Sequence, residues 1–144
     1  MATGFIPLET GGAFTGFICY YGREATTSSN TWNNTVYGYI RDYLSYSSST
    51  FTVLKAFSAT VMIYGKGSYK EASGGAGRGI SYSMTKTSGG STTTIVSGSV
   101  DAIGSGTDSA SVSFAVGDTF SLSLSFSGSG TCGSQCGFIM NATA

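Results

Sequence analysis

The sequence has no histidine, one proline and one tryptophan among its 144 residues. Without histidine, neither a Ser-His-Asp nor a Cys-His catalytic centre can form. Charge is scarce as well, because seven Lys and Arg balance seven Asp and Glu and only 10% of the residues are charged. An ordinary soluble domain has about 25%. The cations are scattered along the chain, which argues against nucleic-acid binding through a basic patch.

Long apolar runs and helix-forming segments are also missing. No stretch of about 18 apolar residues could cross a bilayer, and residues 1–7 lack the basic start and apolar segment of a secretory signal. We therefore expect synthesis in a reducing cytosol without membrane insertion. Runs of Ala, Leu, Glu and Lys are absent, and this composition disfavours a helical fold.

Small polar residues and aromatic residues take the place of charge. The chain has 25 Ser, 19 Thr and 22 Gly, and its aromatic content is 13%. That aromatic content excludes a disordered chain, and the length fits one domain with one core. We expect a single β-sandwich domain over residues 1–144, in which residues 1–50 supply N-terminal strands or a docking segment.

Alternation of apolar and polar residues is the dominant pattern, and it is clearest in the last third of the chain. Val112, Phe114 and Val116 alternate with small residues, Gly117-Asp118 interrupts, and apolar residues then alternate with serine. We interpret this pattern as two adjacent strands joined by a tight turn. Each strand has an apolar face and a serine face that meets water or a neighbouring subunit. The predicted core residues are Phe114, Phe120, Leu122, Leu124 and Phe126.

Shorter segments of the same type recur between Gly-, Ser- and Asn-rich turns. About nine strands are expected, at residues 14–21, 36–46, 51–54, 59–64, 79–85, 92–100, 112–116, 120–126 and 137–140. Residues 59–64 are apolar on both sides, which predicts a central strand covered on both faces. Residues 34–46 also have apolar residues at helical spacing, so a short helix is the alternative there, although four tyrosines favour a strand.

Catalytic motifs are weak. The carboxylates, Asp101, Asp108 and Asp118 among them, form no recognisable pair, so a polysaccharide hydrolase with two facing carboxylates is the least supported class. Asp118 follows a glycine in a turn, and Asp101 and Asp108 fall in a Gly/Ser loop, where such residues usually bond the local backbone. We predict no catalytic site, no cofactor, no metal and no enzymatic activity.

Three cysteines, Cys19, Cys132 and Cys136, cannot all pair within one chain. With no histidine to complete a set of four ligands, they do not predict a zinc site. Cys132 and Cys136 either form a local disulfide in a loop or remain free thiols. A reducing cytosol favours free thiols.

Tyrosine and tryptophan gather in the first third of the chain. These residues are enriched at interfaces, where one end of the side chain is apolar and the other is wet. Aromatic rings also stack on sugars. We therefore predict that these rings lie in the core and at a subunit interface, with a ligand face as the alternative. The candidate residues are Trp32, Tyr37, Tyr39, Tyr43 and Tyr46.

Residues 51–140 resemble the jelly-roll domains of the tumour-necrosis-factor and complement-globular-head type. The matching features are a segment from Phe51 to Tyr64 that leads into a central strand, the strand before Gly117-Asp118, the alternating strand after it, and the closing residues 137–140. The resemblance implies an antiparallel jelly-roll sandwich that forms a homotrimer and binds surface ligands. Bacteriophages use such domains in fibres and on heads.

The composition resembles that of tailed-phage virion proteins, which cell lysis releases without a secretion signal. We expect a non-enzymatic virion protein on the head or tail that serves as a fibre or receptor-binding module for host-surface glycans. A capsid decoration or tail scaffold protein that clamps neighbouring subunits is the alternative. The expected partners are further copies of the chain, other virion proteins and a host glycan.

Overall fold

The computed structural model describes residues 15–26, 32–69, 79–101, 104–127 and 132–143. Within these ranges the chain forms β-strands and no helix, which confirms the all-β prediction. The strands are β1 (Gly16–Thr26), β2 (Trp32–Tyr39), β3 (Leu44–Ser47), β4 (Thr50–Val53), β5 (Phe57–Tyr69), β6 (Gly79–Ser88), β7 (Ser91–Asp101), β8 (Ser105–Phe114), β9 (Thr119–Ser127) and β10 (Cys132–Thr143). None of the described residues belongs to a helix that could span a membrane.

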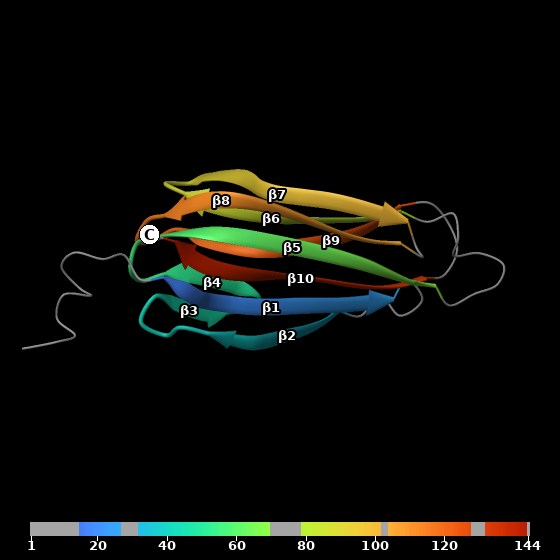
Figure 1. Cartoon of the computed structure of the whole chain (residues 1–144), viewed down its shortest axis with the longest axis horizontal. Coiled ribbons are helices and arrows are strands. Elements are labelled where there is room, and N and C mark those ends of the chain that lie inside the picture. The colour runs from blue at the N-terminus through green and yellow to red at the C-terminus, as the bar shows by residue number, and fades with distance from the viewer. Residues whose placement is uncertain (1–14, 27–31, 70–78, 102–103, 128–131, 144) are drawn as a thin grey trace, which may run out of the picture.

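The strands form two five-stranded antiparallel sheets that pack face to face (Figure 1). Sheet A has the order β2-β1-β10-β5-β8, and sheet B has the order β3-β4-β9-β6-β7. Most neighbouring strands are distant in sequence, and β1 pairs with β10 over the whole length of β1. This arrangement confirms the antiparallel jelly-roll sandwich.

Aromatic rings dominate the core between the sheets. The Phe51 ring centroid lies 5.2 Å from that of Phe120 and 6.0 Å from that of Phe138. Of the predicted core residues, Phe114, Phe120, Leu122 and Leu124 are buried, as the alternation predicts. Phe126 lies on β9, but its side chain falls outside the described part of the chain.

The predicted hairpin around Gly117-Asp118 is wrong. β8 ends at Phe114 and pairs with β5 in sheet A, whereas β9 begins at Thr119 and pairs with β4 and β6 in sheet B. The turn therefore carries the chain from one sheet to the other, and the two apolar faces meet across the core. Val116 lies in this turn and is 66% exposed. Alternation determines which side chains share a face, but it does not choose the partner strand.

Residues 36–46 form neither one strand nor a helix. β2 ends at Tyr39, a turn covers residues 41–43, and β3 begins at Leu44 in the other sheet. The amides of Tyr43 and Leu44 both donate to the Ile40 carbonyl at 3.0 Å and so close the turn. The helical spacing of apolar residues arises because the chain crosses between sheets while it keeps contact with one core.

β5 is an interior strand of sheet A, between β10 and the edge strand β8, and not its central strand. Only one of its faces is covered, whereas the sequence predicted cover on both. Ala59, Val61 and Ile63 are buried against sheet B, whereas Thr60 and Met62 are exposed on the outward face. Met62 is therefore an apolar side chain exposed on the outward face of sheet A.

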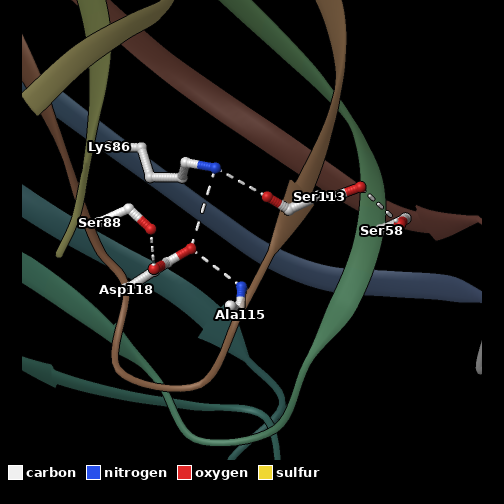
Figure 2. Close-up of polar contacts among 6 residues, drawn as sticks. All are labelled: Ser58, Lys86, Ser88, Ser113, Ala115 and Asp118. Atoms are coloured by element: carbon white, nitrogen blue, oxygen red, sulfur yellow. Dashed lines mark hydrogen bonds and ion pairs between the residues drawn. The ribbon is translucent and has the colours of Figure 1, made fainter.

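Asp118 holds the turn between β8 and β9 (Figure 2). Its carboxylate is buried and accepts hydrogen bonds from the Ala115 amide, at 2.9 Å, and from the Ser88 hydroxyl. The Lys86 ammonium lies 3.9 Å from the same carboxylate and donates to the Ser113 carbonyl at 2.9 Å. The turn is thus tied to β6 and β8, and the predicted backbone-bonding role of Asp118 is confirmed.

We expect Asp118→Ala to lower the free energy of unfolding by about 2 to 3 kcal/mol, because hydrogen bonds to a charged group contribute more than neutral ones. The Ser88 hydroxyl and the Ala115 amide lower the pKa of the Asp118 carboxyl. A lowered pKa stabilises the fold above the unfolded value of about 3.9, and this contribution is lost as the pH falls through the folded pKa.

Denaturant titrations of the wild type and of Asp118→Asn between pH 7 and pH 2.5 measure this contribution. The stability difference between the two proteins should be full above about pH 4 and should shrink below it. A difference that stays constant over the whole range would show that the charge of Asp118 does not stabilise the turn.

Candidate functional site

The outward face of sheet A carries a hollow of about 250 Å³, which we call the tyrosine pocket. It is lined by Tyr20, Gly22, Arg23, Thr35, Tyr37, Tyr64, Gln135 and Cys136. The rings of Tyr20 and Tyr37 stack with their centroids 4.4 Å apart. The hydroxyls of Tyr20 and Tyr64 are 3.3 Å apart, within hydrogen-bond distance. Tyrosines from three strands therefore converge at one point on the sheet.

Two glycines form the floor of the pocket. Gly22 on β1 pairs with Gly137 on β10, and Gly137 pairs with Tyr64 on β5. A Cβ atom at Gly137 would lie 2.5 Å from the Tyr64 hydroxyl oxygen, and one at Gly22 would lie 3.1 Å from the Tyr37 ring. The tyrosines approach the backbone this closely because glycine leaves the space open.

The Tyr64 hydroxyl and the Cys136 thiol of the pocket are both protonated at neutral pH. Burial raises the pKa of the Tyr64 hydroxyl, and its hydrogen bond with Tyr20 raises it further, so Tyr64 stays protonated at neutral pH. Arg23 extends toward sheet B, where its Nη1 atom donates to the Leu122 carbonyl at 2.8 Å. Burial raises the pKa of the Cys136 thiol to about 12. A neutral thiol of this kind is a poor nucleophile.

Cys19 and Cys136 are free and buried. Cys132 and Cys136 both lie on β10, and residues four apart on a strand are separated by about 13 Å, too far for a disulfide. The local disulfide considered from the sequence is therefore wrong. Burial also raises the pKa of the Cys19 thiol, which makes it unreactive.

Of the five aromatic residues predicted as an interface or ligand face, Tyr37 alone lines the pocket. Tyr39, Tyr43 and Tyr46 are partly buried and pack against the core, where the Tyr46 ring lies 4.7 Å from that of Phe51. Trp32 is on β2, and its side chain lies outside the described residues. An interface role for the five remains a prediction.

Sequence reasoning did not place Tyr20 and Tyr64 in the site. The two residues are 44 positions apart in the chain, and each belongs to an ordinary apolar segment. The local signal is a glycine next to or near each tyrosine, as in Tyr20-Tyr21-Gly22. Only the pairing of β1, β10 and β5 brings these tyrosines together.

The outward face of sheet B confirms the predicted serine face and extends it over three strands. Register aligns twelve hydroxyl side chains in rows across β7, β6 and β9, such as Ser97, Ser83 and Ser123. A shallow hollow of about 350 Å³ on this face is lined by Ser81, Tyr82, Ser83, Ser97, Gly98, Ser99, Ser123 and Ser125. We call it the serine hollow.

Among the side chains that the structure describes, no carboxylate lines either hollow. The Asp118 carboxylate already accepts a hydrogen bond from the Ala115 amide of its own turn. Asp108 lies within β8 and not in the Gly/Ser loop predicted for it. Asp101 likewise ends β7. Among the described residues, no three His, Cys, Asp or Glu side chains lie close enough together to hold a metal ion. The tyrosine pocket offers both rings and hydroxyls, whereas the serine hollow offers hydroxyls alone.

No protein-family model matches the sequence, and the search of curated proteins gives no match. Among solved structures, the Eiger TNF of S. frugiperda superposes with a TM-score of 0.54 at 12% identity, covering 90% of this chain and 94% of that one. The fold is a jelly roll of the tumour-necrosis-factor type. Murine APRIL has a TM-score of 0.49 at 12% identity, over 83% of this chain and 98% of its own.

The globular domain of zebrafish complement 1qA has a TM-score of 0.48 at 12% identity, covering 84% of this chain and 96% of that one. The superposition on Eiger confirms the fold that the sequence resemblance implied. At this identity the likeness concerns the tumour-necrosis-factor fold alone.

Proposed function

We propose that this chain is a non-enzymatic structural module on the surface of a bacteriophage virion, where it acts as a homotrimer and attaches the particle to a host-surface glycan. The observation that carries the proposal is the uncovered apolar surface of sheet A on a tumour-necrosis-factor fold. Low charge and abundant Ser, Thr and Gly support the virion setting.

Five large apolar side chains are exposed among the described residues, and three of them lie on the outward face of sheet A. Phe17 is 41%, Tyr37 58% and Met62 39% exposed. Ile139 connects Met62 to Tyr20 across the β10 register. Apolar surface gathered in this way is typical of protein interfaces. A threefold assembly, as the family resemblance implies, would cover it.

Light scattering and native mass spectrometry at micromolar concentration should give about 44 kDa, three times the 14.7 kDa chain. Met62→Lys should weaken assembly by roughly 100-fold or more, because a buried unpaired charge costs several kcal/mol. Thr94→Lys, exposed on the opposite sheet, is the matched control and should leave the mass unchanged. A wild-type protein that stays at 14.7 kDa would refute the trimer.

The proposed location on a phage particle is tested separately. Antibodies against the trimer should label intact particles of the phage that encodes it, and the purified trimer should bind host cells. Labelled particles together with a trimer that ignores host cells would favour the decoration or scaffold alternative.

A further inference from the structure

We infer that the open edge of β9 binds an extended strand from a different protein. By the open edge we mean the side of β9 that faces away from β6, over residues 122–127. The inference goes beyond the proposed function, because it concerns the edge of sheet B and not the outward face of sheet A. Only the choice of a different protein over a second copy rests on the proposed trimer.

β9 extends well beyond the strand that pairs with it on this side. β9 covers Thr119–Ser127, but its pairing with β4 ends at Phe120, opposite Phe51. In the part of the chain that the structure describes, no other strand continues this pairing. On its other side, β9 pairs with β6 over its whole length. Figure 1 shows β9 and β1 continuing past the short strand β4.

The backbone groups of every second residue of β9 point toward the β4 side. The Val53 amide of β4 donates to the Asp118 carbonyl at 2.8 Å, and Phe120 is the next residue of β9 to pair with β4 in this phase. The Leu122 carbonyl follows the same phase, because it accepts a hydrogen bond from Arg23 of β1 at 2.8 Å. Amide and carbonyl groups alternate between the two sides of an antiparallel strand, so the even-numbered residues of β9 face the open edge.

Leu124 and Phe126 continue this alternation beyond the Arg23 contact. The pairing of β9 with β6 contains no bulge that would change the phase. The amide and carbonyl groups of both residues therefore point to the open edge, where no strand of the described chain receives them. Six residues at about 3.4 Å each give an edge of roughly 20 Å, which is long enough for one added strand.

The four outer strands of the two sheets each have a feature that prevents pairing with another chain. β3 has only four residues. β2 and β7 contain bulges, in which Tyr37 and Ile95 are the extra residues. β8 carries Asp108 opposite the buried Ile63, so a charge lies on the inner side of this strand. Short strands, bulges and inward charges are the usual protections of sheet edges. Residues 122–127 have none of these, which singles out this edge for strand addition.

The side chains beside the open edge define the chemistry of the partner strand. Leu122 and Leu124 are buried, whereas Ser123 and Ser125 are exposed on the outward face. An added strand places alternate side chains on the same two faces, and directly opposite side chains contact each other. The partner is therefore an extended segment in which apolar residues alternate with small polar ones. Main-chain hydrogen bonds provide its affinity, and the alternate side chains provide its specificity.

A second copy of this chain is the competing occupant. Pairing of β9 with β9 of another copy would be two-fold symmetric. The proposed trimer has three such edges, and each would join a further trimer, so that growth would not stop at a defined mass. A strand from a different protein saturates each edge. It also lies in the plane of sheet B and leaves the outward face of sheet A available for the trimer.

Hydrogen exchange of the wild-type protein, followed by NMR, tests the open edge without any partner. The amides of Leu124 and Phe126 should exchange at least about 100-fold faster than those of Ser123 and Ser125, which pair with β6. Equal protection of the two pairs would show that the edge is already covered within the protein, and would overturn the inference. This result does not depend on whether the protein is a trimer.

The probe for strand addition is a short synthetic peptide of alternating valine and threonine with a cysteine at one central polar position. Ser125→Cys places a thiol beside the open edge, at a position where side chains of paired strands approach closely. Ser99→Cys, exposed on the same face but on the bulged strand β7, is the matched control. In a glutathione buffer, Ser125→Cys should capture at least about tenfold more peptide than Ser99→Cys, with the wild type as the baseline. The same peptide with every amide N-methylated should be captured at least about tenfold less, because it has no backbone donors.

The protection of Leu124 and Phe126 should rise at least about tenfold when the cysteine-free peptide is bound. Equal capture by the two cysteine variants, or equal capture of the N-methylated peptide, would show that no strand is added to β9. A wild-type mass that grows beyond the trimer with concentration, and that falls when the peptide is added, would assign the edge to a second copy and not to a different protein. A wild-type protein that remains monomeric refutes the proposed trimer, but the exchange pattern and the capture still decide the edge.

Discussion

Replacing Gly65 with alanine should destabilise the fold by at least about 3 kcal/mol, at the upper end of what overpacking a core costs. Gly65 lies on β5 and faces the Tyr82 ring of the opposite sheet. A Cβ atom at Gly65 would lie 2.1 Å from the nearest ring carbon. Tyr82 is only 2% exposed, so its ring cannot swing into solvent to relieve the clash.

Two further glycines, on other strands, also pack closely against the Tyr82 side chain. A Cβ at Gly98 would lie 2.7 Å from the same ring, and one at Gly106 would lie 3.1 Å from its hydroxyl oxygen. Tyr82 therefore occupies a slot that glycines of three strands leave open, and the ring has nowhere to move. Glycine inside a strand often marks such a close approach.

Thermal and denaturant unfolding of Gly65→Ala, at matched protein concentration, measure the effect. Gly38→Ala is the control on the same sheet, because its nearest contact would be the Phe17 ring at 3.7 Å; it should change stability by less than about 1 kcal/mol. Adding Tyr82→Leu to Gly65→Ala should recover part of the loss. Equal stability of Gly65→Ala and Gly38→Ala would show that the Tyr82 ring does not need the space that Gly65 leaves open.

Phe120→Ala should cost about 3 to 5 kcal/mol, as is usual for removing a buried phenylalanine. The Phe120 ring is 1% exposed. Its centroid lies 5.2 Å from that of Phe51 on β4 and 5.2 Å from that of Phe114 on β8. One ring thus joins both sheets, and its removal leaves a cavity that the surrounding aromatic rings cannot fill.

Chemical denaturation provides the measurement, again at matched concentration because assembly adds to apparent stability. Val116→Ala removes an apolar side chain that is 66% exposed and should change stability by less than about 0.5 kcal/mol. A Phe120→Ala protein within 1 kcal/mol of the wild type would place Phe120 outside the core. The comparison also distinguishes the core face of β9 from the turn that precedes this strand.

The alternation of apolar and polar residues in the sequence correctly predicted which side chains of β8 and β9 face the core. Phe114, Phe120, Leu122 and Leu124 were expected on an apolar face, and all four are buried. The serine face opposite them was equally predictable. In an extended strand, successive side chains point to opposite sides, so the face of each residue is a local property.

The partners of each strand were not predictable in the same way. β8 and β9 follow each other in the chain yet lie in different sheets, and residues 36–46 cross between sheets at Ile40. Strand pairing depends on how all the apolar faces are covered together. A local pattern contains no information about that arrangement.

The all-β class, the inward and outward faces of the strands, and the exclusion of histidine-dependent catalysis all follow from the residue pattern. The meeting of Tyr20, Tyr37 and Tyr64 over Gly22 and Gly137 depends instead on how the strands are arranged in the folded protein. The tyrosines of β1 and β5 are neighbours because β10, from the far end of the chain, inserts between them. Side-chain orientation follows from the geometry of a single strand, whereas a site built across strands depends on register, which the packing of the whole sandwich sets.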